Sequence, residues 1–313
     1  MGKLIGIACI LALLCIGLAI QEPKFFQERN ILNLSRQIGF LGIYAMGAGI
    51  VIITGGIDLS VGSLMGLIGV LLAMSLTEWG LAVPAAVLFC LVVAALLGWT
   101  HGFLITKARL QPFVVTLCGL LIYRGAARYI AEDSTRGFGS GFTTFKKLAN
   151  GHIGPIPYSL ILMFAIALGL IFLIHFSVYG RHLFAVGGNE QAARFSGVPV
   201  NRVKTIAYIL AALLTCVAGI LIALYTNAIQ PASHGQFYEL YAIAAAVLGG
   251  CSLRGGEGTV IGVILGATLI QILWNAVTLL GIESYLEYAV IGGVILISAI
   301  ADEVLRTRFR RVG

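Results

Sequence analysis

Long apolar runs separated by short polar stretches make up most of the chain. A run of about 20 apolar residues crosses the hydrocarbon of a bilayer as an α-helix. The pattern predicts about ten such helices, at 4–20, 38–54, 62–76, 81–105, 113–130, 156–176, 205–225, 240–249, 259–280 and 285–301. We therefore expect an all-α polytopic membrane protein whose 313 residues form a single transmembrane domain.

One polar interruption, residues 55–63, organises this pattern because it lies between two apolar runs. Backbone groups in a bilayer must all be hydrogen-bonded, so a broken helix is tolerated only where protein or a water-filled cavity surrounds it. Transporters place their substrate pathways at such breaks. The sequence therefore predicts a translocation pathway lined by Asp58, Ser60 and Ser63. Asp58 and Ser60 are also residue types that cap helices, and the two interpretations are compatible.

Residues 249–256 repeat the glycine spacing GGxxLxxG of residues 55–62. Paired interrupted segments in the two halves of a membrane protein indicate a pathway between them. Six predicted helices separate the two motifs, and because six is even, the repeat would be parallel rather than inverted. We expect a second re-entrant or broken segment here.

Arg124 and Arg128 lie one helical turn apart in the run at 113–130. Arginines near the end of a membrane helix usually extend to the interface. Arg124 lies deeper in the run than Arg128, which leaves open an internal partner for it.

The polar stretch 177–204 contains a predicted short helix within 187–197. Asn189 can cap this helix, Glu190 lies in its first turn, and Gly197 ends it. Two turns of helix are not stable alone, so this one needs a docking surface. An interfacial helix is the alternative, but Ala192 and Ala193 beside Phe195 form a compact face that favours a protein contact.

Composition supports the membrane interpretation: 59% of residues are hydrophobic and 11% are charged, against about a quarter charged in soluble domains. The net charge of +7 comes from basic loops. More Lys and Arg lie on the side that carries both termini, so the positive-inside rule places both termini in the cytoplasm. We therefore expect lipid, and not nucleic acid, to surround the protein.

Residue types that carry enzymatic chemistry do not occur in catalytic patterns. The histidines and cysteines have no metal-ligand spacing, and no GxxxxGK[ST] phosphate loop is present. No nucleophile beside a base and no paired catalytic carboxylates can be recognised. The sequence predicts neither catalytic residues nor a metal or cofactor.

Several motifs together resemble the permease subunits of bacterial ABC sugar importers of the ribose/xylose/galactose group. They extend from about Ile38 to the C-terminus and comprise Gly55-Gly56-Ile57-Asp58-Leu59-Ser60-Val61-Gly62-Ser63, Thr116-Leu117, Tyr123-Arg124-Gly125, Gly187-Gly188-Asn189-Glu190, Ala192-Ala193, Ser196-Gly197, Ala242-Ile243-Ala244-Ala245 with Gly249-Gly250, Asn275 and Asp302. Cys251 and Arg254 depart from the pattern, because the family more often has small or hydroxyl residues there.

The resemblance implies a subunit of the bacterial inner membrane that is not itself an enzyme. A cytoplasmic ATPase subunit would dock on 177–204 as on a coupling loop. A second permease chain, identical or paralogous, would enclose the path, and a periplasmic binding protein would deliver a monosaccharide. The implied pathway residues are Asp58, Ser60, Ser63, Thr116, Arg124 and Asn275. The implied coupling residues are Gly187, Gly188, Asn189, Glu190, Ala192, Ala193 and Gly197.

A secondary transporter driven by an ion gradient is the alternative. It would need ionisable groups inside the membrane, and Asp58 is nearly the only carboxylate in position. The motif at 187–197 favours the ATP-driven importer. The sequence leaves open which sugar is carried.

Overall fold

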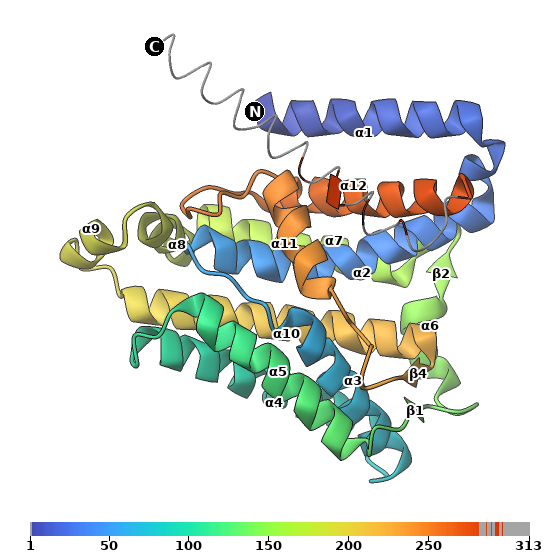
Figure 1. Cartoon of the computed structure of the whole chain (residues 1–313), viewed down its shortest axis with the longest axis horizontal. Coiled ribbons are helices and arrows are strands. Elements are labelled where there is room, and N and C mark those ends of the chain that lie inside the picture. The colour runs from blue at the N-terminus through green and yellow to red at the C-terminus, as the bar shows by residue number, and fades with distance from the viewer. Residues whose placement is uncertain (1, 282–285, 287–288, 290–291, 294–295, 297–313) are drawn as a thin grey trace.

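In the computed structural model, which describes residues 2–281 and positions 286, 289, 292, 293 and 296, long helices lie side by side (Figure 1). Six helices of the described part are long and apolar enough to cross a membrane: α2 (Glu28–Ile53), α4 (Val83–Thr106), α5 (Pro112–Ile130), α7 (Tyr158–Ile171) with the π-helical turn η2 (Phe172–Phe176), α10 (Val200–Thr226) and α12 (Val260–Leu279). The protein is therefore a multi-pass helical membrane protein.

Three further apolar helices occupy the predicted runs 4–20, 62–76 and 240–249, and the side chains of the first are described over Gly6–Gln21. They are α1 (Gly2–Gln21), α3 (Val61–Thr77) and α11 (Tyr238–Leu248). α11 has 11 residues and is too short to cross a bilayer alone. The tenth predicted run, 285–301, lies outside the described residues apart from isolated positions.

The remaining elements lie in the connections between these helices. They are η1 (Pro23–Phe26), β1 (Arg136–Gly137), α6 (Thr143–Asn150), β2 (His152–Ile153), β3 (Ile156–Pro157), α8 (Val178–Gly188), α9 (Glu190–Phe195) and β4 (Ala228–Ile229). β1 pairs antiparallel with β4, and β2 with β3. These two-residue pairs depart from the all-α prediction, but they only tie connecting loops together.

α2 forms the centre of the bundle. It is buried over most of its length, whereas α4, α5 and α7 expose large apolar side chains such as Leu88, Leu121 and Leu168. Extended apolar surface on so many helices is suited to lipid. α2 begins at Glu28, ten residues before the predicted start at Ile38. Its polar first turns combine exposed residues such as Glu28 and Asn33 with the buried Leu34 and Arg36.

Glycines bring the helices into close contact. A Cβ atom on Gly98 of α4 would lie 2.6 Å from the carbonyl oxygen of Tyr208, and one on Gly102 would lie 2.6 Å from the Cα of Thr205, both in α10. The spacing GxxxG lets two helices pack backbone to backbone. This contact fixes α4 against α10 beside the polar break between α2 and α3.

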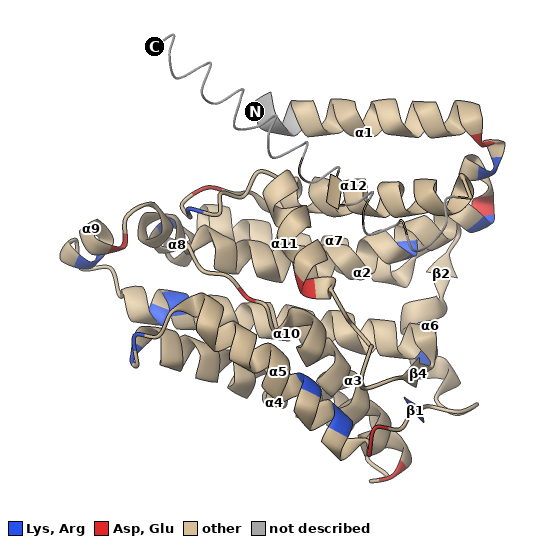
Figure 2. Ribbon diagram, in the orientation of Figure 1, with Lys and Arg blue, Asp and Glu red and all other residues tan. Residues whose placement is uncertain are grey.

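Charged residues gather at the two ends of the long helices (Figure 2). One end carries α8 and α9, and the opposite end carries α6 and the strands. Between them the ribbon is almost entirely uncharged, as expected for a layer of hydrocarbon about 30 Å thick. Only a few charged segments lie inside this layer, and the polar break is one of them.

Candidate functional site

The polar break joins the end of α2 to the start of α3, and its carboxylate is buried. Asp58 is 5% exposed. Its Oδ1 atom accepts hydrogen bonds from the backbone N–H of Ser60, at 2.8 Å, and from the Ser60 hydroxyl, at 2.7 Å. The Ser63 hydroxyl donates to the carbonyl oxygen of Ser60 at 2.8 Å. Asp58 therefore stabilises the turn before α3, as its residue type predicts, while Ser60 itself occupies the N-cap position without a side-chain cap bond.

Side chains from three other helices enclose this turn. Thr116 of α5 and Tyr208 of α10 both donate to the carbonyl oxygen of Ile57, at 3.4 and 3.2 Å. His101 of α4 and Tyr123 of α5 share a hydrogen bond of 2.8 Å. All four side chains are buried. We call Asp58, Ser60, His101, Thr116, Tyr123 and Tyr208 the polar cluster.

His101 and Tyr208 were missed as site residues by the sequence analysis, and Tyr123 was noted only as part of a motif. The carboxylate of Asp58 lies within electrostatic range of all three. A signal was present in the sequence: His101 interrupts an otherwise apolar helix, and polar residues inside membrane helices usually mark function. Testing the histidines only for metal spacing overlooked it.

Arg124 lies beside the polar cluster and has an internal partner. Its guanidinium donates to the carbonyl oxygens of Pro231 and His234, at 3.0 and 2.6 Å. The loop that it holds leads to Glu239 at the start of α11, whose buried carboxylate lies against Gly62 at the start of α3. Arg124 therefore fastens the loop before α11 over the start of α3.

Asn275, predicted to line the pathway, makes a different contact. Its side-chain amide exchanges two hydrogen bonds with that of Asn30, at 2.7 and 3.0 Å. These bonds join α12 to the start of α2. Hydrogen bonds bring Asp58, Ser60, Ser63 and Thr116 together around one turn, with Arg124 beside them, whereas the described bonds of Asn275 lead to α2.

The two glycine motifs end their helices in the same way. After α2, Gly55 has φ +76° and the N–H of Gly56 donates to Val51; after α11, Gly250 has φ +92° and the N–H of Cys251 donates to Ala246. Both are Schellman motifs, in which glycine accepts the left-handed conformation. The equivalent positions are Gly55 and Gly250, so the structural match is shifted by one residue from the repeat predicted by spacing.

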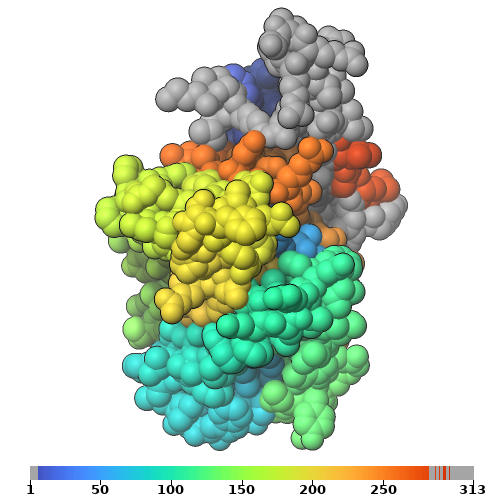
Figure 3. All heavy atoms as spheres, turned by 90° about the vertical axis from the view of Figure 1, so that its left-hand side faces the viewer, coloured from blue at the N-terminus to red at the C-terminus, as the bar shows by residue number. Residues whose placement is uncertain are grey.

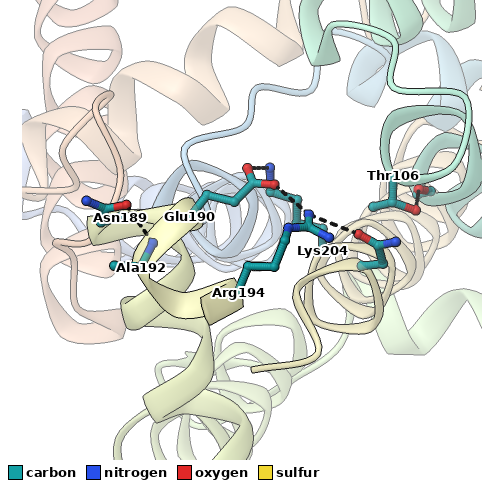
Figure 4. Close-up of polar contacts among 8 residues, drawn as sticks. Thr106, Asn189, Glu190, Ala192, Arg194 and Lys204 are labelled. Carbon is teal, nitrogen blue, oxygen red and sulfur yellow. Dashed lines mark hydrogen bonds and ion pairs between the residues drawn. The ribbon is translucent and has the colours of Figure 1, made fainter. Parts of the chain in front are cut away.

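The predicted short helix is α9, and its predicted ends are confirmed. The Asn189 side chain accepts from the N–H of Ala192 at 2.9 Å, and Gly197 has φ +82°. Glu190 extends from α9 toward α10, where it pairs with Lys204, and it also pairs with Arg194 at 3.1 Å (Figure 4). The predicted loop 177–204 is largely helical, because α8 precedes α9 and α10 already begins at Val200.

These cations perturb Glu190. Partial burial by itself would raise the pKa of its carboxyl, but the hydrogen bonds and positive charges of Lys204 and Arg194 outweigh burial and lower the pKa below its usual 4.5. The ionised form is therefore favoured. It fastens α9 to the start of α10.

One expectation for α9 was wrong. Ala193 is 5% exposed and faces the protein, whereas Phe195 is 90% exposed. The two side chains therefore do not form one outward face with Ala192. Ala193 packs α9 against the rest of the protein, and Phe195 lies on the outer surface of the helix.

α8 and α9 reach the polar break through glycines. A Cβ atom on Gly187 would overlap the carbonyl oxygen of Ile53, the last residue of α2, and the N–H of Gly256 donates to that same oxygen at 2.9 Å. A Cβ on Gly255 would lie 2.8 Å from the nitrogen of Gly55. We call this contact of Ile53, Gly55, Gly187, Gly255 and Gly256 the glycine junction.

Comparison with known proteins identifies the class of this molecule. Residues 30–299 match the family described as "Branched-chain amino acid transport system / permease component". The chain is 40% identical over 293 residues to the ribose import permease protein RbsC of Bacillus subtilis, covering 93% of this chain and 90% of the relative. It is 38% identical to RbsC of Escherichia coli K12 over 285 residues, with 90% and 88% covered.

A more distant relative is the xylose transport system permease protein XylH of Haemophilus influenzae, 30% identical over 359 residues, with 96% of this chain and 94% of the relative covered. No solved structure matches the chain. The resemblance drawn from the sequence motifs is confirmed by these matches. The chain belongs to the permease-component family of ABC importers, and it is a membrane component rather than an enzyme.

Proposed function

We propose that this chain is the permease subunit of an ABC importer in the bacterial inner membrane and that it carries a monosaccharide of the ribose or xylose type. The relatives named as ribose and xylose permeases supply the substrate class. The observation that carries the mechanism is the contact of Gly187 with Ile53. It connects α8 and α9, the segment we assign to ATPase docking, to the helix end that precedes the polar break.

The sugar passes beside the polar cluster. Asp58, Ser60, Ser63 and Thr116 offer carboxylate and hydroxyl groups, which are suited to the hydroxyls of a sugar. Arg124 holds the loop before α11 at the edge of this path. Since Asn275 bonds Asn30, we assign it a role in holding α12 to α2, which borders the path.

Coupling begins at α9. Gly187, Gly188, Asn189, Glu190, Ala192, Ala193 and Gly197 shape the segment, and the exposed Phe195 is its outermost large side chain. An ATPase subunit that moves α8 and α9 would also displace Ile53, because the backbones of Gly187 and Ile53 are in direct contact and close-packed atoms transmit displacement. The turn at Asp58, five residues further along the chain, would follow.

The assembly contains further partners. A cytoplasmic ATPase subunit docks on α9, a periplasmic binding protein delivers the sugar, and a second permease chain completes the path. We assign the N-terminus to the cytoplasm, in agreement with the positive-inside rule. Six of the predicted apolar runs precede α9, and with an even number of crossings α9 lies on the ATPase side. A single cysteine at position 195 should then react with a membrane-impermeant maleimide only from the cytoplasmic side.

The decisive experiment compares two exposed aromatic residues, Phe195 in α9 and Tyr129 near the end of α5. Only the first lies in the segment assigned to ATPase docking. Phe195→Asp removes a side chain that is 90% exposed on α9, and the control Tyr129→Asp removes one that is 86% exposed at the end of α5. We expect Phe195→Asp to abolish both ATPase association and ATP-driven ribose uptake in proteoliposomes, while Tyr129→Asp retains both. Uptake that follows an ion gradient without any ATPase subunit would disprove the importer.

A further inference from the structure

A groove of about 730 Å³ opens between α4 and α10, next to α9. Figure 3 shows this end of the molecule, where the segment around α9 and the start of α10 (yellow) lies beside the end of α4 and the start of α5 (teal to green). Six lining residues carry the argument: Trp99, Phe103, Lys107, Arg194, Arg202 and Ile206. None of them belongs to the polar cluster or to the glycine junction.

The α4 wall of the groove changes from apolar to cationic along one helix face. Trp99, Phe103 and Lys107 are spaced four residues apart, so they lie on the same face over about 12 Å of helix. The rings of Trp99 and Phe103 stack with centroids 5.4 Å apart. Both are nearly half exposed, and Ile206 of α10 adds apolar surface opposite them.

The polar end of the groove carries excess positive charge. Lys107, Arg194 and Arg202 line it, and no Asp or Glu does. Glu190 neutralises Arg194 from outside the lining, but in the part of the chain that the structure describes neither Lys107 nor Arg202 has an ion-pair partner. Among the described residues, these two cations therefore have no counter-charge where the helices leave the apolar layer.

We propose that this groove binds an anionic phospholipid of the inner leaflet. Its phosphate group lies at Lys107 and Arg202, and an acyl chain runs along Trp99, Phe103 and Ile206. Basic pockets between membrane helices on the cytoplasmic side are suited to anionic headgroups, and aromatic rings are suited to the interface below them. A soluble acidic protein could pair with Lys107 and Arg202, but it would not fill the apolar part of the groove at Trp99, which lies eight residues before Lys107 in the chain.

The inference rests on the proposed function only in one respect: the cytoplasmic position of α9 assigns the groove to the inner leaflet. Lipid binding itself needs neither ATP nor sugar. A bound lipid would also border α9 through Arg194, and it would fill the space between α4 and the start of α10. The transporter would then respond to the anionic lipid content of its membrane.

Tryptophan fluorescence gives a direct test on the full chain. A protein that retains only Trp99 (Trp79→Phe, Trp274→Phe) is reconstituted in phosphatidylcholine vesicles containing an equal share of brominated phosphatidylglycerol or brominated phosphatidylcholine. We expect stronger quenching of Trp99 by the anionic lipid. The control retains only Trp79, which is 48% exposed like Trp99 but lies beside Glu78 and outside the groove, and it should show no preference.

Charge removal decides the assignment. Lys107→Gln with Arg202→Gln should reduce the anionic preference of Trp99 about fivefold per cation, while Lys146→Gln with Lys147→Gln, at the other end of the molecule, should not. Native mass spectrometry with phosphatidylglycerol and phosphatidylcholine, on the chain with all its tryptophans, supplies a second readout. Equal quenching by both lipids, or a preference that survives loss of both cations, would overturn the proposal. Loss of ATPase binding without any lipid preference would instead make the groove a protein-docking surface.

Discussion

Gly187 in α8 lies against the carbonyl oxygen of Ile53, the last residue of α2, so closely that no side chain fits between them. The same oxygen accepts a hydrogen bond from Gly256, so three distant segments meet at one atom. Helical propensity does not explain a glycine at this place, because glycine weakens a helix. Close approach of two backbones does.

Alanine substitution at the two adjacent glycines of α8 separates packing from propensity. Gly187→Ala should lower stability by about 1–3 kcal/mol, the usual range for overpacking a filled site, and it should lower ATP-driven uptake because the junction is displaced. Gly188→Ala is the matched control for packing, since a Cβ there would meet nothing within 4 Å. It lies in the same coupling segment, so any uptake it loses is not caused by displacement of the junction. Thermal unfolding and uptake assays check both. Equal behaviour of the two variants would contradict the role given to the junction.

Asp58 allows its structural and transport roles to be separated. Asp58→Asn retains a side-chain oxygen that can accept from Ser60, so the unfolding temperature should stay close to that of the wild type. Uptake should fall about tenfold, because a charged acceptor binds hydroxyl groups more strongly than a neutral one by roughly 1.4 kcal/mol.

Asp58→Ala removes the acceptor as well, leaves the buried Ser60 donors unsatisfied, and should also lower stability by about 1–3 kcal/mol. Unfolding and uptake are measured on the same preparations. Wild-type uptake by Asp58→Asn would reduce Asp58 to a turn stabiliser. Equal instability of both variants would show that the carboxylate charge, and not its oxygen atom, supports the turn.

Hydropathy and glycine spacing predict most helices because membrane helices satisfy local rules. Apolar length defines a span, and Asn189 and Gly197 define α9 through local capping. The sequence does not predict which polar residues meet. His101, Tyr123 and Tyr208 come from three helices and come close to the turn at Asp58 only through tertiary packing. The polar residues at 28–37 hid the start of α2, because hydropathy alone does not show that they continue the helix.

The same reasoning explains why the sequence did not show the direction of Ala193 or the partner of Asn275. A stretch of sequence shows that Ala192 and Ala193 are small, but their directions differ by about 100° around a helix, and only Ala193 points inward. Asn275 was assigned to the pathway by resemblance alone. The Asn30 partner that satisfies its amide is 245 positions away in the chain, which no local pattern reveals.

The ion pairs of Glu190 should make the attachment of α9 dependent on pH. A carboxyl whose pKa is lowered in the folded state contributes stability above its unfolded pKa, and the contribution is lost as pH falls through the folded pKa. For Glu190 that window lies below 4.5. The difference in unfolding temperature between wild type and Glu190→Gln should therefore be constant above this pH, and it should disappear below it.

High salt should also reduce this difference, because the Glu190 and Arg194 side chains are about half exposed and screened by solvent. Glu132→Gln is the control, because Glu132 is an exposed carboxylate that forms no ion pair with any residue the structure describes. Its unfolding temperature should follow that of the wild type at every pH. A Glu190 difference that depends on neither pH nor salt would show that the side chain acts through packing.

Arg124 and Arg128 lie one turn apart on α5, but substitution should destabilise the protein at Arg124 and have little effect at Arg128. Arg124 donates to two backbone carbonyls of the loop before α11, whereas Arg128 pairs with Asp133 on the surface. Arg124→Gln should cost about 1–3 kcal/mol through unsatisfied carbonyl groups and should reduce uptake, because the loop is released from the start of α3. Arg128→Gln should leave the stability close to that of the wild type, because a solvent-exposed ion pair contributes little.

Hydrogen exchange at residues 231–239 provides the local readout for this pair. Exchange there should rise in Arg124→Gln and stay unchanged in Arg128→Gln, since only the first variant removes bonds to the loop. Both bonds come from one guanidinium nitrogen, Nη1. Arg124→Lys keeps the charge and the N–H donors but places them on a shorter, flexible side chain, so it should show intermediate exchange. Arg124→Lys could instead match the wild type in both exchange and uptake. That result would show that the positive charge alone holds the loop, through its electrostatic attraction to the buried carboxylate of Glu239.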